Sequence, residues 1–434
     1  MLSHFQPISA LVVGDFMLDT YTTGRVRRIS PEAPVPVMEV LKQEARPGGA
    51  GNVVLSLLAL GAHVIAAGRI GNDVEGRAIE TALGAAGIDS SFLLVEKEYA
   101  TPVKNRLIAD SQQLLRVDRE MVAPISPRFE QKLLQRLEGV VQKVHVIALS
   151  DYGKGLLTPT LIARIIDLAK KENVPIIIDP KGVDFRKYRG ATILKPNLSE
   201  AYAAVQMGLK EPLEAVAAKI HQITDVDYLL ITRSEAGISL FDKSLRRWDF
   251  PVRSKEVIDV TGAGDTVLAV VSAALANRLD LSSAVQLANI AAGIAIERLG
   301  CAQITLAELA CRLLEFDGDS KVFDENHAFA LREVLKGKPY VLLVLSKGQK
   351  MSNVLFRTLR SLKGDLREHL VVYARDGHID DEFVHLLSSL QEVDTIILQP
   401  DSLKKLCETV HPSGIYFLER EKLRKEEGAL GILL

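Results

Sequence analysis

A glycine-rich turn that leads directly into an apolar run constrains this chain more than any other stretch. The turn reads Asp-Val-Thr-Gly-Ala-Gly-Asp-Thr over residues 259–266, and the apolar run continues from Val267 to Leu275. β-Branched residues before the turn predict a strand, and the Ala- and Val-rich run after it predicts a buried helix. The glycines allow a tight turn that leaves amides bare at the helix start, where the helix dipole strengthens an anion site.

Asp265 lies at this positive helix end, which stabilises an ionised carboxylate. A base beside a phosphate site is what phosphoryl transfer to an alcohol requires, so we predict that Asp265 accepts the hydroxyl proton. The amides of Gly262, Ala263 and Gly264 would then stabilise charge on the transferring phosphoryl group. The short pattern alone is also compatible with an ordinary capped turn. The sequence contains no Gly-x-x-x-x-Gly-Lys-Ser/Thr, which argues against a P-loop enzyme.

Composition bounds the class of protein. A length of 434 residues exceeds one typical domain, so two domains are expected. The formal charge of −2 gives no reason to expect binding to nucleic acid or to a membrane surface. The three cysteines form no Cys-x-x-Cys pair, which favours a reducing compartment over a disulfide scaffold or a zinc site. With no basic leader and no apolar run of transmembrane length, we expect a cytoplasmic protein.

Acids and lysines follow three strand-like runs, at 9–14, 144–150 and 175–178. In open α/β sheets, ligands bind beyond the carboxyl ends of the strands, so we expect these side chains around a substrate. Asp19 could equally cap a turn, and Lys154 taken alone could be a surface residue. The predicted set is Asp15, Asp19, Asp151, Lys154, Asp179 and Lys181.

Two further segments carry candidate substrate residues. Gly48 and Gly49 permit close backbone approach just before a helix predicted at 53–60, and Asn52 can both donate to and accept from a polyol. Strand-like segments at 104–106 and 112–120 carry several cations, three of which are candidates either to neutralise a substrate phosphate or to form a solvated face. These cations are Lys104, Arg106 and Arg116.

Prolines at 31, 34 and 36 exclude a helix between residues 27 and 41 and predict edge strands or an extended arm. The alternating valines of this arm give it an apolar face that needs a partner.

The turn at 259–266 resembles the signature of ribokinase-like sugar kinases, the phosphofructokinase B family. Arg-Ile-Ser-Pro-Glu-Ala-Pro-Val-Pro-Val at 28–37 resembles the heptose 7-phosphate kinases, including the kinase half of the bifunctional heptose kinase/adenylyltransferases. The resemblance implies a kinase domain over residues 1–314, built as a doubly wound α/β sheet with a small β lid. It places the lid at about 20–45 and 100–120, over the sugar, where the lid pairs with its copy in a homodimer.

The resemblance also implies a reaction: ATP phosphorylates D-glycero-β-D-manno-heptose 7-phosphate at its 1-hydroxyl, in ADP-heptose synthesis for lipopolysaccharide core. Magnesium accompanies ATP, and a monovalent cation is left open. In this family Asn-x-x-Glu belongs to the metal–water shell, although a capping box alone would explain the pattern. Lys195 stands where the family has a small polar residue, which leaves that contact open. The implied nucleotide residues are Asn197, Leu198, Ser199, Glu200 (reaching the metal through water), Thr232, Gly237 and Asn289.

The C-terminal third predicts a second, smaller Rossmann-like α/β domain at 321–434, after a polar linker at 315–320. Its strands are expected at 340–345, 369–374, 394–398 and 414–418. Its place resembles that of the nucleotidyltransferase half of the bifunctional enzymes, whose first strand leads to His-x-Gly-His. Residues 346–355 contain no histidine, and the similar stretch at 322–327 precedes a predicted helix at 329–336 instead of following a strand.

We therefore expect a degenerate nucleotidyltransferase domain. Three alternatives stay open: a kinase for another sugar or sugar phosphate, a bifunctional kinase/adenylyltransferase with an active C-terminal domain, and a non-catalytic regulatory module.

Overall fold

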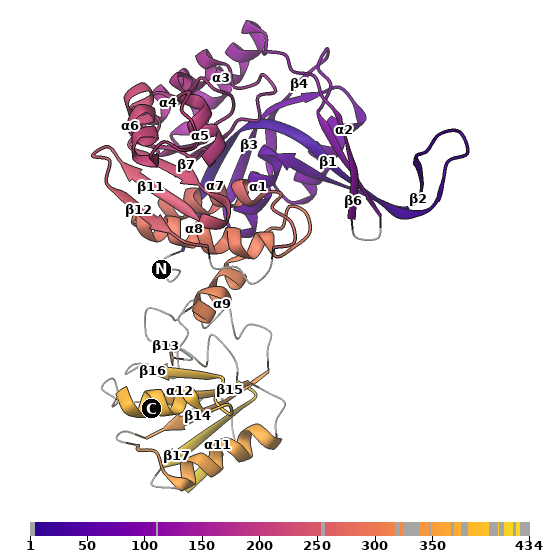
Figure 1. Cartoon of the computed structure of the whole chain (residues 1–434). Coiled ribbons are helices and arrows are strands. Elements are labelled where there is room, and N and C mark those ends of the chain that lie inside the picture. The colour runs from indigo at the N-terminus through magenta and orange to yellow at the C-terminus, as the bar shows by residue number, and fades with distance from the viewer. Residues whose placement is uncertain are drawn as a thin grey trace. The chain divides into compact units, whose positions relative to one another are not determined.

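The structure is a computed structural model that describes residues 5–109, 112–252, 257–316, 322–323, 339–346, 349–365, 369–374, 381–398, 407, 412–419 and 422–425. Contacts divide the chain into one unit of Gln6–Thr305 and a second of Leu306–Leu434 with Met1–Phe5 (Figure 1). The division falls at 305, whereas the sequence predicted a kinase domain extending to 314 and a linker at 315–320. Residues 317–320 of that linker lie outside the described residues.

A long sheet forms the centre of the first unit, because its strands are continuous runs of buried aliphatic residues. The strands are β1 (Ser9–Ile29), β3 (His63–Gly71), β4 (Asp89–Glu96), β7 (Val146–Ser150), β8 (Ile176–Asp179), β9 (Ile193–Leu194), β10 (Tyr228–Thr232), β11 (Ile238–Asp242) and β12 (Arg247–Phe250). Their order is β12-β11-β10-β9-β8-β7-β1-β3-β4, parallel except around β11. The order reverses between β1 and β7, and such a switch point is where doubly wound sheets bind ligands.

Helices cover both faces of this sheet, as expected for a doubly wound fold (Figure 1). One face packs against α3 (Pro127–Val141), α4 (Pro159–Lys171), α5 (Leu198–Ala204) and α6 (Leu213–Thr224) in a single apolar core. The other face carries α1 (Ala50–Ala59), α7 (Ala263–Ala276) and α8 (Leu281–Ile296), and α2 (Val74–Ala85) packs near β4. α4 begins at Pro159, which suits the first helical position, and the side chain of Thr158 caps it by accepting the amide of Leu161.

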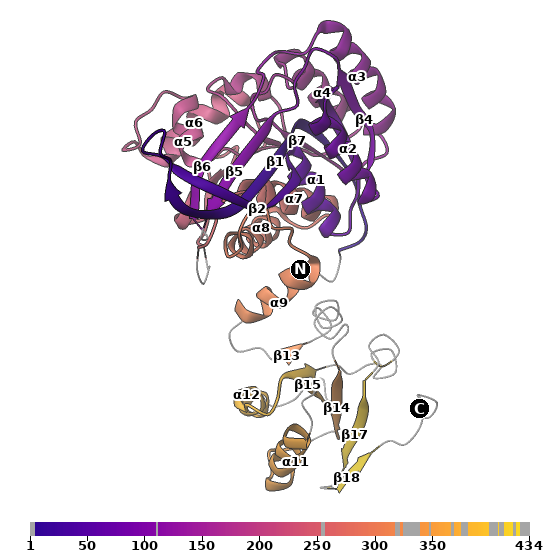
Figure 2. The same ribbon diagram turned by 90° about the vertical axis from the view of Figure 1, so that its right-hand side faces the viewer.

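Beyond the sheet, β1 continues into a small lid and pairs there with β2 (Pro36–Gly49) and β5 (Val103–Ala109). A further strand, β6 (Gln112–Arg119), pairs with β5, so the lid order is β2-β1-β5-β6 (Figure 2). The tip of the β1–β2 ribbon projects away from the unit (Figure 1). It leaves Ile29, Val40 and Leu41 more than half exposed, at 60%, 57% and 56%.

The strand predicted immediately before the turn at 259–266 is wrong. Residues 257–260 form an irregular segment in which Val257 and Val260 are 58% and 68% exposed. The carboxylate of Asp259 accepts hydrogen bonds from the amide and hydroxyl of Thr261, at 2.9 and 2.7 Å. These local bonds give the backbone an alternative to a strand ladder.

The second unit has its own parallel sheet, in the order β13-β16-β15-β14-β17-β18, with only β18 antiparallel among its described strands. Its elements are α9 (Leu306–Phe316), β13 (Val322–Phe323), β14 (Tyr340–Leu345), α11 (Asn353–Asp365), β15 (His369–Ala374), α12 (Asp381–Ser389), β16 (Thr395–Leu398), β17 (Gly414–Glu419) and β18 (Lys422–Lys425). The four strands predicted here are all present, and β14 to β16 share an apolar core with α11 and α12. Residues 324–327 of the similar stretch and the helix predicted at 329–336 lie outside the described residues.

Among the helices that the structure describes, each is too short or too polar to cross a bilayer.

Candidate active site

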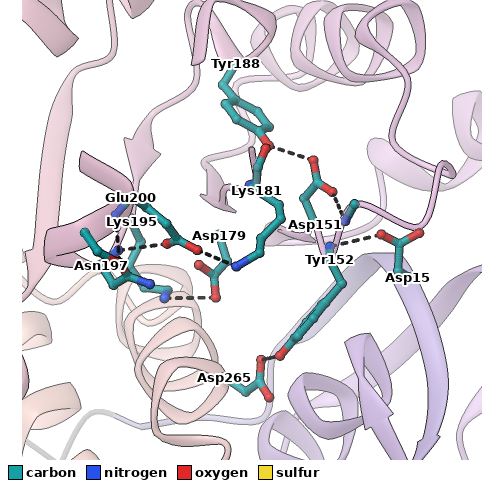
Figure 3. A network of polar contacts seen from close by, with 12 residues as sticks. Asp15, Asp151, Tyr152, Asp179, Lys181, Tyr188, Lys195, Asn197, Glu200 and Asp265 are labelled. Atoms are coloured by element: carbon teal, nitrogen blue, oxygen red, sulfur yellow. Dashed lines mark hydrogen bonds and ion pairs between the residues drawn. The ribbon is translucent and has the colours of Figure 1, made fainter. Parts of the chain in front are cut away.

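Asp265 lies in the first turn of α7, with Gly262 as the N-cap in a left-handed conformation at φ 79°. A residue with a Cβ would be strained there, and the added atom would lie 2.7 Å from Nδ2 of Asn52. The carboxylate is 3% exposed. Its Oδ2 accepts a hydrogen bond from Nδ2 of Asn52 at 2.8 Å. Its Oδ1 accepts one from the hydroxyl of Tyr152, also at 2.8 Å (Figure 3).

Burial raises the pKa of Asp265 to about 6. The nearby carboxylate of Asp179 raises this pKa further, whereas the hydrogen bonds from Asn52 and Tyr152 and the charge of Lys195 lower it. A carboxylate that is mostly ionised at neutral pH, but that takes up a proton readily, is suited to act as a general base.

The start of α7 presents positive charge to the space in front of Asp265. The amide of Ala263 is already used, since it donates to the carbonyl of Val260 at 3.3 Å. A methyl group added at Gly264 would lie 3.5 Å from Nζ of Lys195, so this ammonium lies against the helix start. Lys195 is 2% exposed and forms an ion pair of 2.9 Å with Asp179. The helix dipole and this lysine together favour an anion at this position.

Asp15 lies within β1, where the pairing of this strand with β3 ends, and Asp151 directly follows β7, at the switch point of the sheet. The carboxylate of Asp15 accepts amide hydrogen bonds from Tyr152, Lys154 and Leu156 at 3.0, 3.0 and 3.3 Å. Asp15 therefore holds the loop after β7 in place.

Asp151 is likewise engaged by the protein. It accepts a hydrogen bond from Nζ of Lys187 at 2.7 Å. It accepts another from the hydroxyl of Tyr188 at 2.6 Å (Figure 3). In this structure the carboxylates of Asp15 and Asp151 are therefore both hydrogen bonded to other groups of the protein.

Asp19 and Arg106 form a buried ion pair at the base of the lid, with Oδ1 and Nη1 2.7 Å apart. The side chain of Asp19 also requires a glycine at position 48, because an added Cβ there would lie 2.0 Å from Oδ2 of Asp19. Gly49 follows Gly48 at the end of β2, directly before α1. The arginine that the sequence offered as a phosphate ligand is thus already neutralised.

The remaining candidate cations differ in their partners. Arg116 is exposed and forms an ion pair of 2.8 Å with Asp118, and Lys154 forms a short ion pair with Glu120. Within the described residues, no ion pair is recorded for Lys104. Its ammonium lies 5.2 Å from the centre of the Tyr152 ring, and burial lowers its pKa. Lys104 is therefore the cation best placed to meet an anionic ligand.

A second set of polar residues lies beyond Asp179. Asn197 caps α5, because its Oδ1 accepts a hydrogen bond from the backbone amide of Glu200 at 2.9 Å. In turn, Oε2 of Glu200 accepts a hydrogen bond from the backbone amide of Asn197 at 3.0 Å. Leu198 and Ser199 are the first two residues of that helix. The other oxygen of Glu200 pairs with Nζ of Lys181 at 2.7 Å (Figure 3). The predicted Asn-x-x-Glu thus forms a capping box.

A pocket of about 450 Å³ lies against the start of α7. Its walls include Thr232, Gly237 and Asn289, as well as Ala263 and Gly264. It is lined mainly by apolar groups and lies one residue from Asp265, which suits the base and ribose of a nucleotide whose phosphates point at α7. The side-chain amide of Asn289 donates to the carbonyl of Pro251 at 2.8 Å.

A magnesium site made by the protein alone does not fit these residues. The described residues contain no cluster of three or more His, Cys, Asp or Glu that could hold a metal ion, and Glu200 is already paired on both oxygens. Magnesium in kinases is held largely by nucleotide phosphates and water, so an ion here would be bound mainly by the nucleotide.

Reasoning from the sequence missed three contributors to the site. Tyr152 bonds Asp265 from a position 113 residues away along the chain. Lys195 was noted only as a departure from a motif. Val257 and Val260, expected in a strand, line the pocket instead. For these two valines, the available signal in the sequence was that they lie directly before the glycine-rich turn.

Comparison with known proteins places these features in context. The profile described as pfkB family carbohydrate kinase matches residues 8–307. A Bifunctional protein HldE from Geobacter sulfurreducens is 37% identical over 439 residues, covering 95% of this chain and 88% of that protein. The protein of the same name from Campylobacter curvus is 42% identical over 436 residues, with 93% and 89% covered.

Similarity to solved structures concerns the fold alone. The structure of Arabidopsis thaliana ribokinase complexed with ribose and ATP matches with a TM-score of 0.58 at 19% identity. The match covers 71% of this chain and 99% of the ribokinase.

Proposed function

Because the chain belongs to the pfkB family of carbohydrate kinases, we propose that it phosphorylates D-glycero-β-D-manno-heptose 7-phosphate at the 1-hydroxyl. The phosphoryl donor is ATP, and the product is the 1,7-bisphosphate, a precursor of ADP-heptose for lipopolysaccharide core. Cytoplasmic ATP makes the cytoplasm the place of this reaction. The observation that carries the proposal is the position of Asp265 between a nucleotide-sized pocket and an unpaired lysine of the lid.

The proposed chemistry follows from this position. The adenosine part of ATP occupies the pocket beside Gly237 and Asn289, so its phosphates reach the start of α7. Asp265 accepts the proton of the sugar hydroxyl as that oxygen attacks the γ-phosphorus, and ADP leaves. The helix start and Lys195 stabilise the negative charge of the phosphates. Magnesium, bound with the nucleotide, would neutralise part of that charge, and a monovalent cation remains an open part of the proposal.

The substrate side of the proposal assigns the 7-phosphate to Lys104. Arg106 is neutralised by Asp19 and Arg116 by Asp118, whereas Lys104 faces the Tyr152 ring next to the base. A phosphate would supply a direct ion-pair partner for this half-buried ammonium, which has none recorded within the described residues. We propose that the other residues predicted around the sugar shape this space, several of them by holding neighbouring side chains or loops in place. These residues are Asp15, Asp19, Gly48, Gly49, Asn52, Asp151, Lys154, Asp179 and Lys181.

The test is ADP release with a panel of sugars and sugar phosphates, in which heptose 7-phosphate should have the highest kcat/KM. Lys104→Ala should raise the KM for the sugar phosphate about ten- to hundred-fold, the range for a lost charge-assisted hydrogen bond. The KM for ATP should change by less than about three-fold, because Lys104 is not among the residues lining the nucleotide pocket.

Arg116→Ala is the matched control, since this exposed arginine already has Asp118 as its partner. Equal effects of Lys104→Ala on both ligands would contradict the phosphate assignment. A higher kcat/KM for a different sugar phosphate would replace the proposed substrate.

Two wider parts of the proposal concern assembly and the second unit. We infer that the lid pairs with its copy in a homodimer, because its exposed Val40, Leu41 and Leu115 would otherwise form an apolar edge open to aggregation. We also infer that the second unit is a nucleotidyltransferase-like domain that has lost its triphosphate-binding residues.

A further inference from the structure

The base is held by two side-chain donors that come from opposite sides. The hydroxyl of Tyr152 donates to Oδ1 of Asp265, and the amide of Asn52 donates to Oδ2, both at 2.8 Å. Asn52 comes from α1. Tyr152 comes from the loop after β7 (Figure 3). Because each carboxylate oxygen has its own donor, rotation of the carboxylate is restricted and its charge is stabilised.

Tyr152 is itself fixed at both ends. Its backbone amide donates to Oδ2 of Asp15 at 3.0 Å, which anchors the residue to β1. Its ring lies 5.2 Å from the ammonium of Lys104. Burial, followed by the charge of Asp265, raises the pKa of Tyr152 well above its usual value. The hydroxyl therefore remains a protonated donor at every pH at which a kinase is assayed.

We propose that Tyr152 is a positioning residue for phosphoryl transfer: its hydroxyl orients the Asp265 carboxylate and keeps it ionised for the incoming sugar hydroxyl. This role rests on the proposed function of Asp265 as the base. It differs from substrate binding, because the hydroxyl of Tyr152 acts on the base and not on the sugar. It also differs from a purely structural role, because the bond ends on the group that titrates during catalysis.

The other groups around Asp265 do not replace this bond. The titratable or charged groups that face Asp265 are Tyr152 after β7, Asp179 at the end of β8, Lys195 after β9 and Cys301 after α8. Lys195 is bonded to Asp179 at 2.9 Å, so it acts on Asp265 only through space. Burial raises the pKa of Cys301 to about 12, which keeps the thiol neutral. Tyr152 is thus the only titratable group recorded as hydrogen bonded to the base, among the residues that the structure describes.

The test is the pH dependence of kcat/KM for Tyr152→Phe, which removes the hydroxyl and keeps the ring over which Lys104 lies. The acid limb of the profile should move up by about one to two pH units, the range for losing a hydrogen bond to a charged group. Near pH 6 the loss should be roughly five- to fifty-fold, and near pH 9 the variant should recover to within about two-fold. Tyr202→Phe is the control. Tyr202 lies in α5, and its hydroxyl donates to the carbonyl of Glu211 at 2.6 Å and not to Asp265. That control should keep the wild-type profile.

Two further measurements test the role of Tyr152 even if Tyr152→Phe is inactive. A ring-fluorinated tyrosine at position 152 is a stronger donor and should move the acid limb down. The protonated carboxyl band of Asp265, assigned by its absence in Asp265→Asn, can be titrated by infrared spectroscopy without any substrate. Its pKa should rise in Tyr152→Phe.

The outcomes separate this inference from the proposed function. Wild-type protein that is inactive on heptose 7-phosphate rejects the substrate, while the infrared titration still decides the role of Tyr152. An unchanged acid limb together with an unchanged infrared pKa in Tyr152→Phe overturns the inference. A loss of activity that is equal at all pH values, with an unchanged infrared pKa, overturns it as well and leaves Tyr152 a structural residue.

Discussion

Three buried carboxylates surround the loop after β7, and their partners distinguish their roles. Asp15 accepts three backbone amides, and Asp151 accepts the ammonium of Lys187 and the hydroxyl of Tyr188. Asp265, like Asp15, has only neutral donors, and no ion pair is recorded for it within the described residues; it differs from Asp15 in that its donors are the side chains of Asn52 and Tyr152 and in that it lies at the start of α7. An acid that is buried without a counter-ion is costly for folding, and such costs are typical of catalytic positions.

Asp265→Asn tests the role of this acid directly. The amide keeps the size of the side chain but accepts no proton, so kcat should fall by roughly 10²–10⁴. ATP binding should persist, because the nucleotide pocket does not depend on the charge of residue 265. Steady-state kinetics and calorimetric titration with ATP provide the two measurements. Turnover within about three-fold of the wild type would exclude Asp265 as the base.

The same substitution has a consequence for stability that depends on pH. The pKa of Asp265 in the folded protein, about 6, lies above its ordinary value of 3.8. Between these values the folded protein binds more protons than the unfolded chain, so the wild type loses stability as the pH rises through this range. Asparagine does not titrate, so above about pH 7 Asp265→Asn should gain up to about 3 kcal/mol relative to the wild type.

Below about pH 4 that gain should vanish, because the acid is then protonated in both the folded and the unfolded states. Urea unfolding near pH 4 and near pH 8 measures the difference. If the free energies of unfolding of the two proteins differed by the same amount at pH 4 and at pH 8, burial would not perturb the pKa of this carboxyl.

At the scale of single elements, the start of α7 is built to leave room for a ligand. A methyl group at Gly264 would make only ordinary contacts, at 3.5 Å from Lys195 and 3.9 Å from Asp179. Gly264→Ala should therefore stabilise the helix by about 0.5–1 kcal/mol. The same methyl would enter the wall of the nucleotide pocket, and kcat/KM for ATP should fall about ten-fold or more from overpacking.

Gly84→Ala provides the control for this substitution. Gly84 lies in α2, and an added Cβ would meet no atom within 4 Å. This variant should show the stability gain without any change in ATP kinetics. If Gly264→Ala bound and used ATP as the wild type does, the phosphates would not pass over the start of α7.

The sequence predicted the elements whose signals are local. The apolar runs at 144–150 and 340–345 predicted β7 and β14 to within two residues. The strand predicted before the turn at 259–266 is absent, because the exposure of residues 257–260 and their local hydrogen bonds outweigh their β-propensity. The sequence also supplied the lid cations but could not tell which one stays unpaired. Asp19 and Arg106 meet only through the pairing of β1 with β5, 87 residues apart.

The lid makes a prediction about assembly. Val40 lies on β2 and is 57% exposed, so Val40→Lys should leave the fold of one subunit intact. If lids pair across a two-fold axis, the substitution places two charges in one apolar interface, and the dissociation constant should rise at least about ten-fold. Sedimentation velocity across micromolar concentrations measures this. Leu209→Lys is the control, at a position outside the lid that is 71% exposed. A monomeric wild type, or an unaffected Val40→Lys dimer, would contradict lid pairing.

At the scale of the whole molecule, the relatives named bifunctional are matched over 95% of this chain and 88% of their own length in Geobacter sulfurreducens. The match therefore extends into the second unit, whose parallel sheet has β14 at the switch point beside β17. In a doubly wound sheet, a ligand would bind beyond the carboxyl end of β14. The residues at that end decide whether a second reaction is possible.

We expect the second unit to catalyse no adenylyl transfer. In that reaction the phosphate of heptose 1-phosphate would attack the α-phosphorus of ATP, giving ADP-heptose and pyrophosphate, and preorganised donors must hold the triphosphate. Residues 346–355, after β14, contain no histidine, and Lys347 lies outside the described residues. Lys350 offers only a point charge on a flexible stem. Pyrophosphate release by the full-length protein should thus lie at least about 10²-fold below its ADP release with heptose 7-phosphate. An active nucleotidyltransferase added to the same mixture confirms that the assay detects the product, and pyrophosphate formation at a rate similar to the kinase reaction would show that both halves are active.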